Sequence, residues 1–260
     1  MKLWALLRKL RLQFKRIRLE RVPEAMTRGQ VVTMPCLGTT VSWLITNPGD
    51  EIQSQQMRHA FYEVETLNNV AAHLVNVNYI YDVGANIGNH SVYFAARFKP
   101  RTIVLVEPYP PAIQHLLANL SLNYASCFDL QYLGFGVSAG RGRATLIPPS
   151  DFNIGLTRLS ESSEGSVNLI SLDEIIGPRP ADLIKIDVEG MEMDVLHGMA
   201  GTLETHRPSV FVEVTDKNKE EVFFFFKKHD YELVYSDRPY QSNMNCLFKP
   251  SELISLGGIA

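Results

Sequence analysis

Apolar runs of strand length along this chain end in acidic residues. In open α/β sheets, ligands bind at the carboxyl ends of the strands. A carboxylate buried without a partner is costly, so acids at several strand ends point to a shared polar site. The acids concerned are Asp82, Glu107, Asp187, Glu189 and Glu213.

Two glycines follow Asp82 in the pattern D-x-G-x-x-x-G, at Gly84 and Gly88. Glycines let a ligand approach the backbone, although on their own they could equally serve a tight turn. Glu107 lies about 20 residues further on, the spacing at which an acid reaches ribose hydroxyls. The third glycine of the dinucleotide motif is missing. The pattern therefore favours a nucleoside-bearing sulfonium cofactor, with ribose but no phosphates, over NAD.

Strand and helix patterns alternate from residue 78 onward, which predicts an α/β domain with a mostly parallel sheet over residues 78–250. Apolar runs predict five core strands, and a hairpin and loop insertion is expected near 138–170, with a surface loop at 148–166. Two further runs are expected to close the sheet. The predicted strands are 79–83, 102–106, 129–137, 181–186, 209–214, 231–235 and 245–249.

Residues 22–77 form a region that we expect to cap this domain. Short β-like pieces at 30–34 and 39–45 are followed by a turn signal, and residues 59–77 have one helical pattern.

The composition is that of a globular protein, with 260 residues, 45% hydrophobic and 20% charged. The three cysteines are odd in number and widely spaced, which fits a reducing cytoplasm. Residues 1–21 carry eight basic side chains and one acid, which leaves 17 basic and 27 acidic residues for the rest. This acidic body argues against nucleic acid as a partner.

The basic segment 1–21 has leucines and aromatics at three- and four-residue steps, which predicts an amphipathic helix. Peripheral contact with an anionic membrane and a docked or partly disordered helix both fit this pattern. Charges interrupt every apolar run, so neither a secretory signal nor a bilayer-spanning segment is expected.

Five segments in order, YIYDVGANIGNHSVYFA, VLVEP, LISLDEII, LIKIDVEGMEMDVLHGM and RPSVFVEV, resemble the FkbM family of S-adenosylmethionine-dependent methyltransferases. The resemblance covers roughly residues 61–249. It implies a class I (Rossmann-like) methyltransferase fold, with a seven-stranded mostly parallel sheet whose last strand is antiparallel. It also implies O-methylation of a hydroxyl, often on a sugar or a polyketide-like metabolite.

The resemblance assigns roles to particular residues. Glu107 resembles the acid that grips both ribose hydroxyls, and Asp187 the polar residue that faces cofactor and substrate. The adenine-side loop falls at Gly136, Val137 and Ser138, where this chain has no acid to meet the adenine. The segment that resembles the methionine-side cradle consists of Asp82, Gly84, Ala85, Asn86 and Gly88.

Methyl transfer to a hydroxyl benefits from a base that takes the proton, and Asp187 and Glu189 are the candidates for that catalytic role. Alternatively, these two and Glu213 could hold a divalent metal, since hard cations prefer carboxylate oxygens. Glu189 could instead be a helix N-terminal acid. His90 could touch the ligand, or serve only capping and packing.

The sequence thus predicts a cytoplasmic O-methyltransferase, peripheral to the membrane if residues 1–21 bind it, acting on a glycan or glycolipid precursor. A small polyketide-like acceptor and a non-catalytic cofactor-binding module are the alternatives. The sequence leaves the acceptor, the metal and the oligomeric state open.

Overall fold

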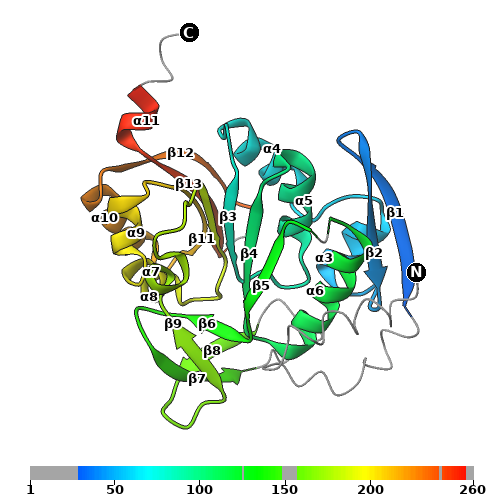
Figure 1. The fold of residues 1–260 in the computed structure, drawn as a ribbon, viewed down its shortest axis with the longest axis horizontal. Helices are drawn as coiled ribbons and strands as arrows, with labels where there is room; N and C mark the ends of the chain where they lie inside the picture. Colours follow the sequence, from blue (N-terminus) through cyan, green and yellow to red (C-terminus); the bar gives the residue numbers. More distant parts are fainter. Residues whose placement is uncertain (1–28, 125, 148–156, 240–241, 256–260) are drawn as a thin grey trace.

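The structure is a computed structural model that describes residues 29–124, 126–147, 157–239 and 242–255. The basic segment 1–21 lies outside the described residues. A seven-stranded sheet forms the centre of the molecule, in the order β12-β13-β11-β10-β3-β4-β5 (Figure 1). Its strands are β3 (Tyr79–Val83), β4 (Thr102–Glu107), β5 (Phe128–Leu133), β10 (Leu183–Ile186), β11 (Ser209–Thr215), β12 (Tyr231–Asp237) and β13 (Asn243–Pro250).

Neighbouring strands from β11 to β5 pair in parallel, while β13 pairs antiparallel with both β11 and β12. The predicted fold class, a class I methyltransferase sheet with an antiparallel last strand, is confirmed. Chain order reverses between β3 and β10, and in open α/β sheets this switch point opens a crevice at the carboxyl ends of the strands.

Helices cover both faces of the sheet (Figure 1). Successive strand residues point to opposite faces, so Ile80 and Leu105 belong to one apolar cluster and Tyr81 and Val104 to the other. The first cluster packs under α4 (Val64–Ala72), α5 (Asn89–Phe98) and α6 (Pro110–Leu122). The helices later in the chain are α7 (Leu172–Ile176), α8 (Glu192–His197), α9 (Ala200–Thr205), α10 (Lys219–Lys228) and α11 (Ser251–Ser255).

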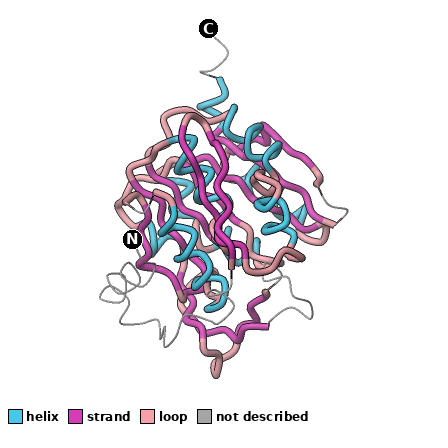
Figure 2. Tube along the Cα trace, turned by 90° about the vertical axis from the view of Figure 1, so that its right-hand side faces the viewer, coloured by secondary structure: helices cyan, strands magenta, loops and turns pink. Residues whose placement is uncertain are grey.

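The predicted strands before residue 46 are confirmed as the antiparallel pair β1 (Gln30–Cys36) and β2 (Thr39–Ile45). Side chains of α6 hold β2, because Asn119 Oδ1 accepts the Leu44 N–H at 2.9 Å and His115 Nε2 contacts the Leu44 carbonyl at 2.6 Å. The tube view shows helices, strands and loops from the side (Figure 2).

The helix predicted over residues 59–77 is present but shorter, as α4, so its predicted bounds are wrong. A second helix that was not predicted, α3 (Glu51–Met57), precedes it. The buried residues of α3 are Gln53 and Gln56, so this helix has no apolar stripe that a periodicity search could find. That residues 22–77 form a separate cap stays a prediction.

The predicted third strand, 129–137, is also wrong as a single element. Gly134, at φ 89°, breaks it into β5 and β6 (Phe135–Val137), which belong to different sheets. The expected hairpin pairing of 135–137 with 144–147 is absent too, because β9 lies between these strands. The smaller sheet has the order β6-β9-β7-β8, with β7 (Gly142–Ile147), β8 (Arg158–Glu161) and β9 (Val167–Ile170), so β8 occupies part of the predicted loop.

Candidate active site

The glycine turn after β3 is folded tightly against β4 and β10. The N–H groups of Gly84 and Ala85 both donate to the Val106 carbonyl, at 2.9 and 3.1 Å. Gly84 has φ 77°, and a β-carbon there would lie 1.8 Å from the carbonyl oxygen of Asp187. Gly84 is therefore required both by its conformation and by the close approach of the chain after β10.

Glu107, at the end of β4, is held by the turn that it faces. Its Oε2 accepts the Asn86 N–H and its Oε1 the Tyr109 N–H, both at 2.9 Å. Burial raises the pKa of Glu107 to about 7, although both backbone hydrogen bonds oppose the shift. The carboxylate is thus fixed in position before any ligand arrives.

Two adjoining cavities open at this edge of the sheet. The smaller, of about 60 Å³, lies between the glycine turn, the end of β4 and the small sheet. The larger, of about 240 Å³, lies between α3, the segment before α4 and the ends of β10, β11 and β13. Asn86, Asp187 and Glu189 line both cavities. A molecule in one cavity would therefore face a molecule in the other across these three residues.

The sequence-predicted site residues divide into two groups. Gly84, Glu107, Gly136 and Val137 line the smaller cavity, and Asn86, Asp187 and Glu189 line both.

Three predicted cradle residues line neither of these cavities. Asp82 is fully buried, and its Oδ2 accepts a hydrogen bond from the Ser91 hydroxyl. Ala85 is also buried, and a β-carbon at Gly88 would lie 2.6 Å from Leu116. These residues support the turn from behind. Their assignment to cofactor binding stays a prediction.

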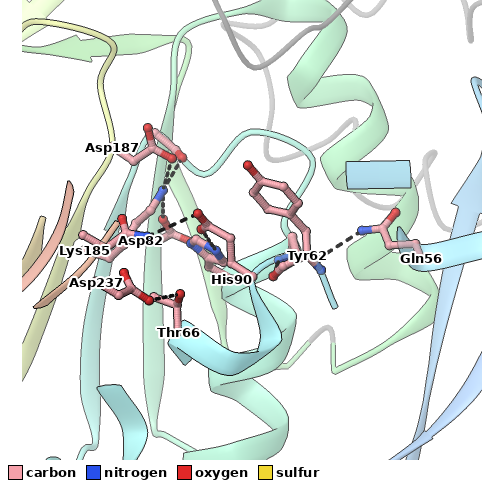
Figure 3. Close-up of polar contacts among 12 residues, drawn as sticks. Gln56, Tyr62, Thr66, Asp82, His90, Lys185, Asp187 and Asp237 are labelled. Atoms are coloured by element: carbon pink, nitrogen blue, oxygen red, sulfur yellow. Dashed lines mark hydrogen bonds and ion pairs between the residues drawn. The ribbon is translucent and has the colours of Figure 1, made fainter. Parts of the chain in front are cut away.

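Lys185 is a site residue that the sequence reasoning missed. Its ammonium group donates to the Gly84 carbonyl at 2.7 Å and lies 3.3 Å from Asp82 Oδ1 and 3.4 Å from Asp187 Oδ2 (Figure 3). Burial alone would lower the pKa of Lys185, but the two carboxylates outweigh burial and raise it. A lone lysine inside the apolar run LIKI was the available signal.

Three carboxylates converge where the cavities meet. Asp187, Glu189 and Glu213 each place an oxygen within 4.8 Å of the others. Burial, with the charge of Asp187 as the second cause, raises the pKa of Glu189 to about 7 and that of Glu213 to about 9. Such a group can accept protons near neutral pH, and its oxygens also suit a hard divalent cation.

The far wall of the larger cavity comes from the segment before α4. Glu63 Oε2 lies 3.3 Å from His90 Nε2, and Glu63 Oε1 accepts a hydrogen bond from Asn245 at 3.2 Å. The Asn89 side chain accepts the N–H of the neighbouring Tyr62 and donates to the Tyr62 carbonyl. The first turn of α5 therefore fixes this wall. The sequence left the role of His90 open and gave no signal for Glu63.

Three residues at these cavities adopt the left-handed region. They are Glu63 (φ 56°), Asn86 (φ 48°) and Glu189 (φ 51°), among nine such non-glycine residues in the described part of the chain. Such backbone conformations cost about 1–3 kcal/mol each.

The Methyltransferase FkbM domain model matches residues 82–241, more than half of the chain. The chain belongs to the FkbM methyltransferase family. This is a family of S-adenosylmethionine-dependent methyltransferases. The match begins at Asp82 and includes the glycine turn and the segment with Asp187 and Glu189 after β10.

Individual relatives of this FkbM methyltransferase are distant. Hexuronic acid methyltransferase AglP of Haloferax volcanii is 28% identical over an alignment of 130 residues, and the match covers 48% of this chain and 52% of AglP. Methyltransferase 1 of Beauveria bassiana is 27% identical over an alignment of 162 residues, and the match covers 54% of this chain and 65% of that protein. The chain thus spans between half and two thirds of these curated relatives.

A solved structure, methyltransferase FkbM of Methylobacillus flagellatus, is similar at 20% identity and a TM-score of 0.49, covering 68% of this chain and 45% of that one.

Within the described residues, none of the helices combines the length and apolar character that a bilayer crossing needs.

Proposed function

We propose that this protein is an S-adenosylmethionine-dependent O-methyltransferase that modifies a hydroxyl of a glycan or glycolipid precursor. The observation that carries the proposal is the pair of adjoining cavities that share Asn86, Asp187 and Glu189. Methyl transfer from a sulfonium is an in-line displacement, so donor and acceptor must face each other nearly in contact. Two cavities with a common border supply that arrangement.

The smaller cavity suits the cofactor. The Glu107 carboxylate stands where ribose hydroxyls would bind, the Gly84 backbone leaves room at the turn, and Gly136 and Val137 border the adenine side. When bound, the cofactor supplies an electrophilic methyl group. The chain's own residues hold that cofactor and exclude water.

The acceptor's proton requires a base at the shared border, where Asp187 and Glu189 are the proposed catalytic residues. A base works best when its pKa lies near the working pH, and the pKa of Glu189 is raised to about 7. Asp187 faces the Lys185 ammonium group, which makes it better suited to orient the hydroxyl. A positioned base contributes about 10²–10⁴-fold to the rate.

The convergence of Asp187, Glu189 and Glu213 also supports the alternative of a divalent metal that binds the acceptor hydroxyls. The two mechanisms predict different responses to chelation. We expect turnover to persist in EDTA. The metal mechanism would be established instead if EDTA abolished turnover, if Mg²⁺ or Mn²⁺ then restored turnover in the wild type, and if neither ion restored it in Glu213→Gln.

The larger cavity favours a sugar over a polyketide-like acceptor. Most of the residues that line it are polar or charged, which suits hydroxyl-rich rings. The lining includes five carboxylates against Lys185 and His90, so a neutral sugar fits better than the hexuronic acid named for AglP.

The test has two stages. Titration calorimetry should show binding of S-adenosylhomocysteine with a Kd in the micromolar range, which corresponds to a binding free energy of roughly −8 kcal/mol. An absence of binding would remove the proposal. Mass spectrometry of glycans from a strain that lacks the protein should then reveal a missing methyl group. Cofactor binding without any missing methyl group would favour the non-catalytic module.

A further inference from the structure

Lys185 lies in the middle of the sheet, on β10, between the fully buried Ile184 and Ile186. It is itself only 3% exposed. Burying an ammonium group costs several kcal/mol unless charges and hydrogen bonds compensate for the lost water. A lysine at this position is therefore either one half of a buried ion pair that only supports the fold, or a group whose contacts serve the site.

The three contacts of the ammonium group lead to three different segments. A lysine ammonium has three N–H donors, and here they face Asp82 on β3, the Gly84 carbonyl in the glycine turn, and Asp187 after β10. Asp82 alone would compensate the charge. The other two contacts go to residues that line the cavities, and the shortest of the three, 2.7 Å, goes to Gly84.

The two segments that Lys185 joins are also in direct contact. The Asp187 carbonyl lies against the α-carbon of Gly84, where a β-carbon would have no room. Movement of the turn would therefore displace Asp187, which borders both cavities. In Figure 3, Lys185 stands between Asp82 and Asp187.

We propose that Lys185 is a positioning residue for methyl transfer, which holds the glycine turn and Asp187 in one fixed arrangement through the Gly84 carbonyl. This inference rests on the proposed function, since it assigns the smaller cavity to the cofactor. Asp82 is the partner that allows the ammonium group to be buried there. Lys185 and Asp82 do not line the smaller cavity, so they act on its shape through Gly84 and Asp187, while Lys185 also lines the larger cavity.

The experiment separates support of the fold from positioning. Removing one partner of a buried ion pair is strongly destabilising, whereas replacing both by neutral groups is often tolerated, so the double variant Asp82→Asn with Lys185→Met should melt no lower than Asp82→Asn. We expect its Kd for S-adenosylhomocysteine, measured by calorimetry, to rise about tenfold or more over that of Asp82→Asn. Lys227→Met, at an exposed lysine, is the control and should bind like the wild type.

A folded double variant that binds within about twofold of Asp82→Asn would overturn the inference and leave Lys185 a purely structural group. If that variant does not fold, Asp82→Asn with Lys185→Leu also removes the contact with the Gly84 carbonyl, and the same comparison and the same limit of about twofold apply. Failure of the wild type to bind removes the proposed function itself.

Discussion

The carbonyl oxygen of Asp187 occupies the space that a side chain on Gly84 would need, 1.8 Å from the position of its β-carbon. Gly84→Ala must therefore push the glycine turn away from the segment that contains Asp187, and it also strains a residue at φ 77°. We expect a loss of about 3 kcal/mol or more in unfolding free energy, measured by urea denaturation, together with loss of S-adenosylhomocysteine binding. Gly140→Ala is the matched control, because no atom lies within 4 Å of its β-carbon, and its stability should not fall.

Glu107 and Asp187 should affect different steps. Glu107→Ala removes the carboxylate of the smaller cavity and should raise the Kd for S-adenosylhomocysteine at least about tenfold. Asp187→Ala should leave that Kd within about threefold while turnover of the acceptor falls about 10²-fold or more. Normal turnover by Asp187→Ala would show that the acceptor's proton and orientation depend on other residues.

Stability of the cofactor-free protein should fall as pH rises. The pKa of Glu213 is raised from 4.5 to about 9, so the folded state holds a proton that the unfolded state releases. The stabilisation is complete below the unfolded value and is lost as pH rises through the folded one. Melting temperatures between pH 5 and 9 should therefore decline.

Glu213→Gln should flatten this decline by about 3 °C or more, which corresponds to about 1 kcal/mol. Glu232→Gln, at an exposed glutamate, serves as the control and should keep the slope of the wild type. Equal slopes in all three proteins would mean that Glu213 is ionised without cost in the folded state.

Residues 1–21 lie outside the described structure, so their contact with membranes stays a prediction that the charge pattern motivates. Deleting residues 1–20 should abolish sedimentation with anionic vesicles and leave S-adenosylhomocysteine binding intact. Neutral vesicles provide the control, because the expected attraction is electrostatic. Vesicle binding that survives the deletion would place the contact elsewhere on the protein.

The parallel core strands β3, β4, β10 and β11 could be predicted because each is a mostly apolar run with an acid at or near its end. That pattern located Asp187 and Glu107 at the same edge, and the parallel pairing of β3 with β4 and β10 brings the ends of these strands together. The local apolar run was sufficient to locate these strands because they are buried on both faces.

The wall of the larger cavity could not be predicted in the same way. Glu63 contacts Asn245, which is 182 residues further along the chain, and no local pattern reports such a contact. Strand β5 ends before Gly134, whose φ of 89° breaks a run that reads as one strand. Lys185 was visible as a charge in an apolar run, but its three partners became apparent only in the folded chain.

The two cavities draw on different parts of the polypeptide, and this has a consequence for engineering. Glu51, Ile52, Tyr62 and Glu63 shape only the larger cavity, so acceptor preference should be exchangeable between relatives by grafting residues 50–63. Because Asn89 and His90 contact that segment, a working chimera would have to transplant them with it, while the cofactor half stays untouched.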